Sequence, residues 1–332
     1  MNRRQVPISK MKVLVFEFIC GGGCFSFPSF GEPSGCLFRE AEEMLHALIE
    51  ELRFGGDLDL LVPVDVRCAH LVRELDAECT VVRSANDLNT MLESASDICE
   101  RQIIVAPEIE NALFDITLRF GVGKKLASPD TDVVKIGSDK WTTYQFLSKQ
   151  GINTPDSFLI QNDRLDRILP QAIIKPRFGA GGLDVRSLNP GDESAEDFRA
   201  AIRDRLHETG LNSDSILVQG FVPGLPVSIA VWNTEKDCFT FPSMLQRFDS
   251  DSFNFSHAEG PLEPELHQRA TTLINQVVKA LPDFRGYLGV DMILGPKDDS
   301  VIDINPRLTT SFCQTRKLIP PGTVKRLLVE SC

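Results

Sequence analysis

Hydrophobic residues in the first third of the chain follow two kinds of spacing. The run from Met11 to Cys20 is almost wholly apolar, which predicts a buried strand that ends at Gly21-Gly22-Gly23. From Leu37 to Phe54, apolar residues recur every three or four positions, which predicts an amphipathic helix with Glu40 on its polar face. Strands are also predicted at Leu58–Val64 and Gln102–Ala106, with a short helix at Asp87–Ala95. Such alternation predicts a parallel sheet covered by helices on both faces.

A second unit begins near Ser138, and its pattern changes again after Pro223-Gly224. The elements predicted between these points are a helix at Lys140–Gln150, strands at Ala172–Lys175, Leu183–Leu188 and Ser215–Gln219, a glycine-rich loop at Phe178–Gly182 and a helix at Glu193–Thr209. The later runs are more antiparallel in character, with strands at Val227–Asn233, Phe239–Leu245, Tyr287–Leu294 and Ser300–Ile304 and a helix at Leu262–Leu281.

The last two predicted strands carry oxygen-bearing side chains. They are joined by a turn-rich connector of hairpin length, so they are expected to pair. Side chains at alternate positions share one face of a strand, so Asp303, Asn305 and Arg307 should point the same way, with Asp291 reaching in from the neighbouring strand. A few hard oxygen ligands on one sheet face suit Mg²⁺ that also holds substrate phosphates. Mn²⁺ would be accepted by the same ligands.

Two lysines and a glycine-rich loop indicate a site for an anion. Lys175 ends a buried strand, where a charge is unfavourable unless an anion meets it. Lys140 opens a helix, where the dipole disfavours a cation. The loop with Gly179, Gly181 and Gly182 joins a strand to a strand, which excludes a P-loop and a dinucleotide fold but allows backbone N–H groups to lie over a triphosphate. Solvated lysines and a plain hairpin turn are the alternative interpretation.

Composition excludes several classes of protein. The net charge of −12 over 332 residues argues against nucleic-acid binding, which needs a clustered basic face. No apolar run approaches the roughly 20 residues that span a bilayer. Arg3 and Arg4 precede an apolar run, but Glu17 interrupts it and no cleavage site follows, so we expect a basic extension with Met11 as a candidate start, and a cytoplasmic protein.

The nine cysteines are an odd number scattered through the chain, which is typical of reduced thiols rather than of a disulfide framework. Cys20, Cys24 and Cys36 lie close enough in sequence to raise the question of a zinc site. No histidine or second cysteine pair completes a tetrahedral set, so small apolar residues near a glycine turn are the preferred interpretation.

The motifs occur in the order typical of the ATP-grasp superfamily, which the chain resembles from about residue 11 to 330. The motifs are Ser-Asp-Lys140, Ile-Lys175-Pro, the glycine loop, Gln219-Gly-Phe-Val222-Pro-Gly224, Gly-Val-Asp291 and Asp303-Ile-Asn305-Pro-Arg307. The resemblance implies an α/β plus α+β protein, with a parallel-sheet N-terminal domain followed by a two-subdomain ATP-grasp fold. We expect the domains to comprise residues 1–125, 126–222 and 223–332.

The resemblance also implies the roles of individual residues. Lys140 and Lys175 would contact ATP phosphates under the loop of Gly179, Gly181 and Gly182. Asp291, Asp303 and Asn305 would bind the metal ion, and Arg307 would act with Lys175 on the transferred phosphate. The adenine edge would be held by Gln219, Phe221 and Val222.

Two positions depart from the pattern of the superfamily. Its second metal carboxylate is usually Glu, whereas Asp303 is one methylene shorter, which favours one metal or shifts the metal position. The residue that usually holds the ribose hydroxyls is also Glu, and Pro226 stands in its place. Ribose contact must therefore come from elsewhere, or nucleotide affinity is lowered.

Short segments further resemble the tyramine–glutamate ligase group, namely Val15 to Gly23, Ala106 to Glu108 and Asn305 to Ser311. This resemblance implies a ligase that activates a carboxylate, such as glutamate, as an acyl phosphate and joins it to a tyramine-like amine. An ATP-grasp phosphotransferase, another amino-acid ligase and a non-catalytic nucleotide-binding module remain alternatives. The expected partners are small-molecule amine and carboxylate substrates, without nucleic acid or membrane, and a homodimer is left open.

Substrate residues are expected at strand ends that face the ATP cleft, where a doubly wound sheet places ligands. Glu17 or Glu108 would attract a cationic amine, with Gly22 and Gly23 beside them; alternatively both carboxylates are solvated or cap helices. Thr310 and Ser311, together with Arg307, would suit the carboxylate substrate, because arginine pairs a carboxylate bidentately. His257 is a candidate base, although a surface histidine is the more common role of such a residue.

Overall fold

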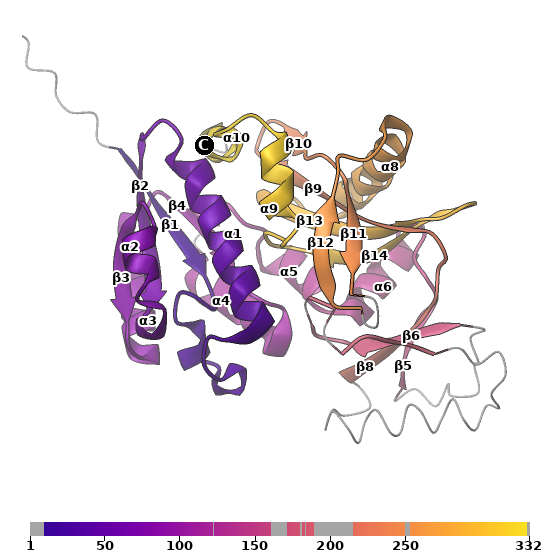
Figure 1. Ribbon diagram of the computed structural model, residues 1–332, viewed down its shortest axis with the longest axis horizontal. Helices are drawn as coiled ribbons and strands as arrows, with labels where there is room; N and C mark the ends of the chain where they lie inside the picture. The colour runs from indigo at the N-terminus through magenta and orange to yellow at the C-terminus, as the bar shows by residue number, and fades with distance from the viewer. Residues whose placement is uncertain are drawn as a thin grey trace, which may run out of the picture.

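A computed structural model describes residues 10–121, 123–160, 171–179, 181–182, 184–188, 215–249 and 253–330. Within these ranges the chain forms three sheets that follow one another along the sequence (Figure 1). The sheets span residues 11–105, 157–220 and 225–305. The predicted domain limits at residues 125 and 222 fall between the sheets, and the division into three domains stays a prediction.

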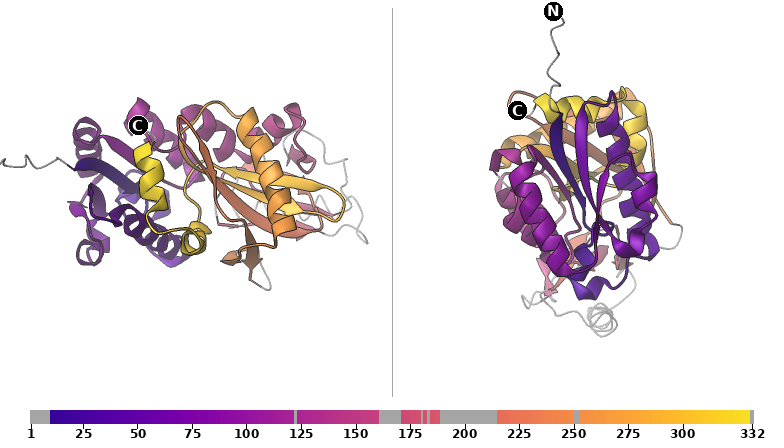
Figure 2. Two further views of the ribbon diagram at one scale, coloured as in Figure 1. Left: turned by 90° about the horizontal axis from the view of Figure 1, so that it is seen from above. Right: turned by 90° about the vertical axis from the view of Figure 1, so that its left-hand side faces the viewer.

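The N-terminal sheet is wholly parallel, as the alternation of strands and helices predicts. It consists of β1 (Met11–Glu17), β2 (Leu58–Asp65), β3 (Glu78–Val82) and β4 (Arg101–Val105), in the order β3-β2-β1-β4. Helices lie on both of its faces, and in the right-hand view of Figure 2 they flank the strands on either side. They are α1 (Gly35–Arg53), α2 (Leu71–Glu74), α3 (Ala85–Ile98) and α4 (Ala112–Phe120).

The second sheet is small and antiparallel. It contains β5 (Ser157–Leu159), β6 (Ala172–Pro176), β7 (Arg186–Leu188) and β8 (Ile216–Gly220), in the order β5-β8-β6-β7. Two helices precede it, α5 (Thr131–Ser138) and α6 (Lys140–Lys149). The helix predicted at 193–209 lies outside the described residues.

The third sheet is antiparallel and carries the last predicted strand pair. It contains β9 (Leu225–Asn233), β10 (Cys238–Thr240), β11 (Met244–Phe248), β12 (Phe255–Glu259), β13 (Gly286–Leu294) and β14 (Asp299–Asn305). The order is β12-β11-β9-β13-β14, with β10 beside β9. The single strand predicted at 239–245 is wrong, because Phe241 to Ser243 break it into β10 and the start of β11. Helix α8 (Pro264–Ala280) packs on β9, β13 and β14.

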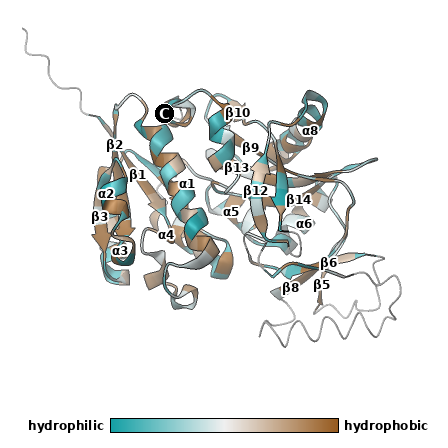
Figure 3. Cartoon of the chain, in the orientation of Figure 1, coloured by the Kyte–Doolittle hydropathy of each residue, from teal (hydrophilic) through white to brown (hydrophobic). Residues whose placement is uncertain are grey.

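The end of the described chain returns to the N-terminal sheet. After β14 come α9 (Phe312–Thr315) and α10 (Thr323–Glu330), and α10 packs against α1 (Figure 1). Phe312, Val324, Leu327 and Leu328 are buried in one core with residues of β1 and α1. Strands β1 and β3 are mainly hydrophobic, whereas α1 and α8 carry both hydrophobic and hydrophilic residues, as helices with one buried face do (Figure 3).

Candidate functional site

A cleft with a cavity volume of about 360 Å³ lies between the second and third sheets. Its walls come from β6 and β8 on one side and from β9, β11, β13 and β14 on the other. The predicted residues that line it are Lys140, Lys175, Gly179, Gly181, Gly182, Gln219, Phe221, Val222, Asp291, Asp303, Asn305, Arg307, Thr310 and Ser311. The structure therefore gathers these residues, which are far apart in sequence, around one cavity.

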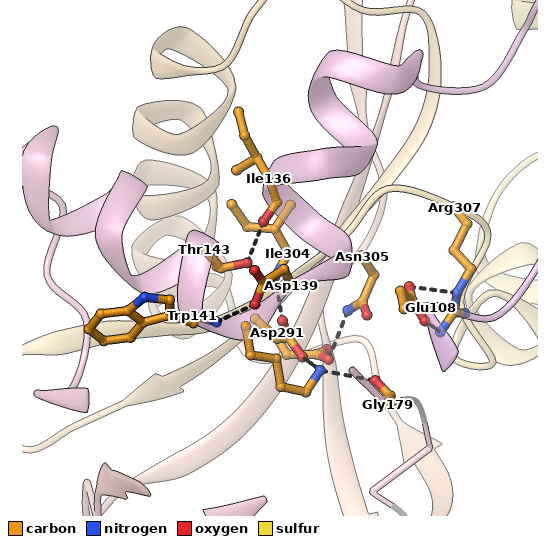
Figure 4. A network of polar contacts seen from close by, with 12 residues as sticks. Glu108, Ile136, Asp139, Trp141, Thr143, Gly179, Asp291, Ile304, Asn305 and Arg307 are labelled. Carbon is orange, nitrogen blue, oxygen red and sulfur yellow. Dashed lines mark hydrogen bonds and ion pairs between the residues drawn. The ribbon is translucent and has the colours of Figure 1, made fainter. Parts of the chain in front are cut away.

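Two carboxylates face each other across the β13–β14 pair. Asp291 is the cross-strand partner of Asp303, and a register shift follows Asp291. The Asn305 Nδ2 group donates a hydrogen bond of 2.9 Å to Asp291 Oδ2 (Figure 4). Burial and the neighbouring Asp303 carboxylate raise the pKa of Asp291 above its ordinary value. Like charges directly opposite in a sheet are destabilising, so this pair favours the presence of a cation.

Asp303 and Asn305 share one face of β14, as the two-residue spacing predicts, and three oxygen-bearing side chains converge. Asn305 donates its N–H to Asp291, which leaves its amide oxygen available to a ligand. The set of two carboxylates and one amide oxygen fits a hard divalent cation such as Mg²⁺.

Lys140 reaches this carboxylate pair from the start of α6. Its Nζ atom donates to Asp303 Oδ2 at 2.5 Å and to Gly179 O at 3.0 Å. Burial opposes its charge, but the Asp303 carboxylate outweighs burial and the pKa of Lys140 is raised. Lys140 thus joins the glycine loop to the carboxylate pair of Asp291 and Asp303.

Asp139 explains why a cation can open this helix. It caps the N-terminus of α6 by accepting a hydrogen bond of 3.0 Å from Trp141 N. The Arg177 side chain donates to both Asp139 oxygens, with Nε at 2.8 Å from Oδ1 and Nη2 at 2.7 Å from Oδ2. Asp139 therefore provides the negative charge that the helix N-terminus favours, while Lys140 turns toward the cleft.

Lys175 occupies β6 and is only 5% exposed. Burial lowers its pKa to about 8; the Asp303 carboxylate acts against this shift and the Lys140 ammonium adds to it. Within the described ranges Lys175 has no ion-pair partner. A buried lysine beside a second lysine is a site where an anion would restore charge balance.

The glycine loop and the strand β8 form a further part of the cleft wall. Gly182 has a φ of +72°, and an added Cβ atom would stand 2.0 Å from the Phe253 carbonyl oxygen, so no other residue fits there. Gln219 is buried and its Nε2 group donates to Ser157 Oγ at 3.2 Å, whereas Phe221 is 42% exposed at the rim.

Arg307 binds Glu108 through a buried bidentate ion pair. Its Nε and Nη2 groups lie 2.8 Å from the two Glu108 oxygens (Figure 4). The Nη1 group donates to Leu308 O at 3.0 Å. These three bonds leave two of the five guanidinium N–H groups available, and Arg307 lines the cleft. Glu108 therefore positions an arginine of the cleft, and it is neither the solvated nor the helix-capping carboxylate of the alternative interpretation.

Glu108 and the other N-terminal candidates lie outside the residues that line the cleft. Glu17 is 3% exposed, and its carboxylate accepts a hydrogen bond of 2.7 Å from Cys20 N, with burial raising its pKa to about 7. A Cβ atom at Gly22 would stand 2.8 Å from Val82, and one at Gly23 would stand 2.3 Å from the Phe18 ring. The tight packing of this turn accounts for both glycines. A role for Glu17, Gly22 and Gly23 in substrate binding stays a prediction.

His257 and the cysteines have simple environments. The His257 side chain on β12 is 52% exposed and lies 3.2 Å from Glu259, outside the cleft, which matches the surface role. The eight described cysteines are free thiols. Among described residues, the metal-sized group of histidine and acidic side chains is Glu42, His46 and Glu74, which contains none of the cysteines. No described helix is both long and apolar enough to cross a membrane.

Sequence reasoning missed three polar residues of the site. Gln246 on β11 donates a hydrogen bond of 3.0 Å to Asp291 Oδ1, and Ser228 on β9 is the cross-strand partner of Asp291. Glu40 accepts a hydrogen bond of 3.1 Å from Thr310 Oγ1, although helical periodicity placed it on the solvent face. The alternation of side chains along the strand could have indicated Ser228. The contacts of Gln246 and Glu40 could not be predicted, because they depend on which elements meet in space.

Comparisons with known proteins identify relatives in sequence and in fold. The chain is 23% identical over 238 residues to tyramine–L-glutamate ligase of Methanocaldococcus jannaschii, which covers 71% of this chain and 65% of the relative. The solved structure of an ATP-grasp superfamily protein from Archaeoglobus fulgidus superposes with a TM-score of 0.69 at 18% identity, covering 96% of this chain and 88% of that chain. The solved structure of D-alanine–D-alanine ligase from Bacillus anthracis superposes with a TM-score of 0.61 at 16% identity, covering 97% of each chain.

The cleft residues fall within the part of the chain that matches a known domain. Residues 137–311 match the ATP-grasp domain family, a match that takes in more than half of the chain. This range contains both lysines, the glycine loop and the Asp291–Asp303 pair, and members of the family bind ATP and divalent metal ions. The chain therefore belongs to the ATP-grasp family.

Proposed function

We propose that the protein is an ATP- and Mg²⁺-dependent ligase that joins a carboxylate to an amine. The observation that carries this proposal is the arrangement around one cleft of two lysines, an arginine and the set of Asp291, Asp303 and Asn305. Glutamate and a tyramine-like amine are the proposed substrates. The name of the relative from Methanocaldococcus jannaschii supports them, although this chain spans about 65% of its length.

The proposed reaction has two steps. The substrate carboxylate attacks the γ-phosphate of ATP, which releases ADP and leaves an acyl phosphate. The amine nitrogen then attacks the acyl carbon, displaces phosphate and loses a proton to give the amide. Protein groups form no covalent bond in either step, so catalysis rests on positioning and on charge neutralisation.

Each group of the cleft has a role in this scheme. Lys140 and Lys175 would neutralise the phosphates beneath the loop of Gly179 to Gly182. Arg307, held by Glu108, would direct its remaining donors toward the acyl phosphate. A divalent cation bound by Asp291, Asp303 and Asn305 would supply further positive charge to the phosphoryl group. The adenine would lie along β8, between Gln219, Phe221 and Val222.

The experiment is a release assay on the purified protein. ADP and free phosphate are measured with MgATP, glutamate and tyramine together, and with each substrate omitted in turn; a panel of other amino acids and amines follows. A ligase releases both products in equal amounts only when carboxylate and amine are both present. ADP without free phosphate would identify a phosphotransferase, and no ADP with any pair would leave a nucleotide-binding module.

A further inference from the structure

The amine substrate needs an anionic contact, and the carboxylates proposed from the sequence are already engaged. The Glu17 carboxylate accepts a hydrogen bond from the Cys20 N–H group inside a turn. Both carboxylate oxygens of Glu108 accept hydrogen bonds from Arg307. A primary amine is a cation near neutral pH, with a pKa close to that of lysine. A further carboxylate beside the cleft is therefore the group to seek.

Glu40 is such a carboxylate, and it lies where three parts of the chain meet. It belongs to the second turn of α1, while its Oε2 atom accepts a hydrogen bond of 3.1 Å from Thr310 Oγ1 in the segment that follows β14. A Cβ atom added to Gly181 would stand 3.8 Å from both Glu40 oxygens, so the glycine loop passes beside the carboxylate. Gly181 and Thr310 both line the cleft.

The structure gives Glu40 no cation of its own. Over the described ranges it forms no ion pair, and Thr310 provides its hydrogen bond. Burial raises its pKa, and the Thr310 hydrogen bond and the more distant Arg307 charge compensate in part. The helix dipole does not account for the residue either, because that field acts within the first turn and Glu40 is the sixth residue of α1.

From this geometry we infer that Glu40, with Thr310 and Gly181 beside it, forms the subsite that receives the ammonium group of the amine substrate. The inference rests on the proposed function for the identity of the ligand. Glu40 then sits on the Arg307 side of the cleft, where the acyl phosphate is proposed to form. Its carboxylate attracts the cationic substrate and leaves an uncharged analogue without a partner, so Glu40 determines specificity for amines.

Binding measurements test the subsite without relying on turnover. Tyramine and 4-ethylphenol, which lacks the amine but keeps the ring, are titrated into protein saturated with Mg²⁺ and a non-hydrolysable ATP analogue. We expect tyramine to bind more tightly to the wild type, and Glu40→Gln to weaken it by about ten- to a hundredfold, as the loss of a charged hydrogen bond does. The 4-ethylphenol affinity should not change.

Two further variants separate charge from packing. Glu43→Gln removes a carboxylate from the same helix at an exposed position and should leave tyramine binding unchanged. Glu40→Asp keeps the charge on a shorter side chain and should restore part of the affinity that Glu40→Gln loses. A thermal melt of each variant establishes that it is folded.

Several results would overturn the subsite. These are an unchanged tyramine affinity in Glu40→Gln, an equal loss of both ligands, and a wild type without preference for the charged ligand over its uncharged counterpart. The ADP release assay tests the proposed ligase activity independently of the subsite. A protein that binds tyramine through Glu40 but never releases ADP would refute the ligase alone, and one that releases ADP regardless of Glu40 would refute the subsite alone.

Discussion

Near the carboxyl ends of β1 and β4, two buried carboxyl groups have hydrogen-bonding partners inside the protein. Glu17 is held by the backbone N–H group of Cys20, and Glu108 pairs with Arg307 at 2.8 Å through both oxygens. In the cleft between the second and third sheets, by contrast, charges are brought together without full compensation. Asp291 opposes Asp303, and Lys175 lies buried near Lys140. Incomplete compensation at a cavity distinguishes a site that takes a charged ligand from one that completes a fold.

The sharpest test of this comparison is the loss of a cleft carboxylate. Asp291→Asn should reduce kcat by about a thousandfold, because the proposed metal ion would lose a charged ligand and would neutralise the phosphoryl group less well. The melting temperature should not fall, since the like-charge contact with Asp303 is removed. ADP release and a thermal melt check both statements. Asp298→Asn, at an exposed turn position between β13 and β14, is the control and should keep wild-type activity. A fully active Asp291→Asn protein would contradict the metal site.

The loss of a satisfied carboxylate should act on stability. Glu108→Gln removes the charge that pairs with buried Arg307, and we expect the free energy of unfolding to fall by about 3 kcal/mol, as for other broken buried pairs. Urea denaturation measures it. Glu110→Gln, at an exposed position nearby, should change stability by less than about 0.5 kcal/mol. If both variants unfolded alike, the Glu108–Arg307 pair would not be structural.

Glu17 gives a smaller effect that depends on pH. Burial raises its pKa from 4.5 to about 7, so the folded state binds its proton more tightly than the unfolded state does. The associated stability is present below pH 4.5 and is lost as the pH rises to 7. Between pH 5 and pH 8 the wild type should lose about 2 kcal/mol through this group. Glu17→Gln should lack that loss in urea titrations, and an identical pH dependence in both proteins would exclude Glu17 as its source.

Lys175 should make ATP binding, rather than stability, depend on pH. Burial lowers its pKa to about 8, so the free protein carries this charge below pH 8 and loses it above. We expect ATP affinity to fall above pH 8, approaching about tenfold per pH unit. Lys175→Arg stays charged and should show a flat profile over this range. Calorimetric titration from pH 7 to 9.5 measures both, and a flat wild-type profile would argue against a phosphate contact.

The smallest effect is expected at His257. Its side chain is exposed beside Glu259 and outside the cleft, so His257→Gln should leave kcat within about twofold of the wild type. A steady-state assay at several pH values would check this. A large loss of kcat at any of these pH values would instead support a catalytic role for His257.

The same comparison separates what the sequence could predict from what it could not. Alternation along β14 placed Asp303 and Asn305 on one face, and hairpin length placed Asp291 opposite them, because both depend on neighbours in sequence. The parallel N-terminal sheet followed from its alternating pattern in the same way. The sequence could not predict the partners of three carboxylates, those of Glu17, Glu40 and Glu108. The partner of Glu17 depends on the burial of a turn, and the partners of Glu40 and Glu108 lie on elements that meet only in three dimensions.

The position of helix α10 determines when the N-terminal sheet can finish folding during synthesis. Val324 N lies 3.4 Å from Glu51 Oε2, a contact between residues 273 positions apart, and Leu327 and Leu328 fill the core beneath α1. The N-terminal sheet therefore cannot reach its final packing on the ribosome until the segment 323–330 has emerged, and both later sheets are translated in the interval. Contacts of such long range slow folding, and the part of α1 that α10 covers stays exposed, and accessible to chaperones, while translation proceeds.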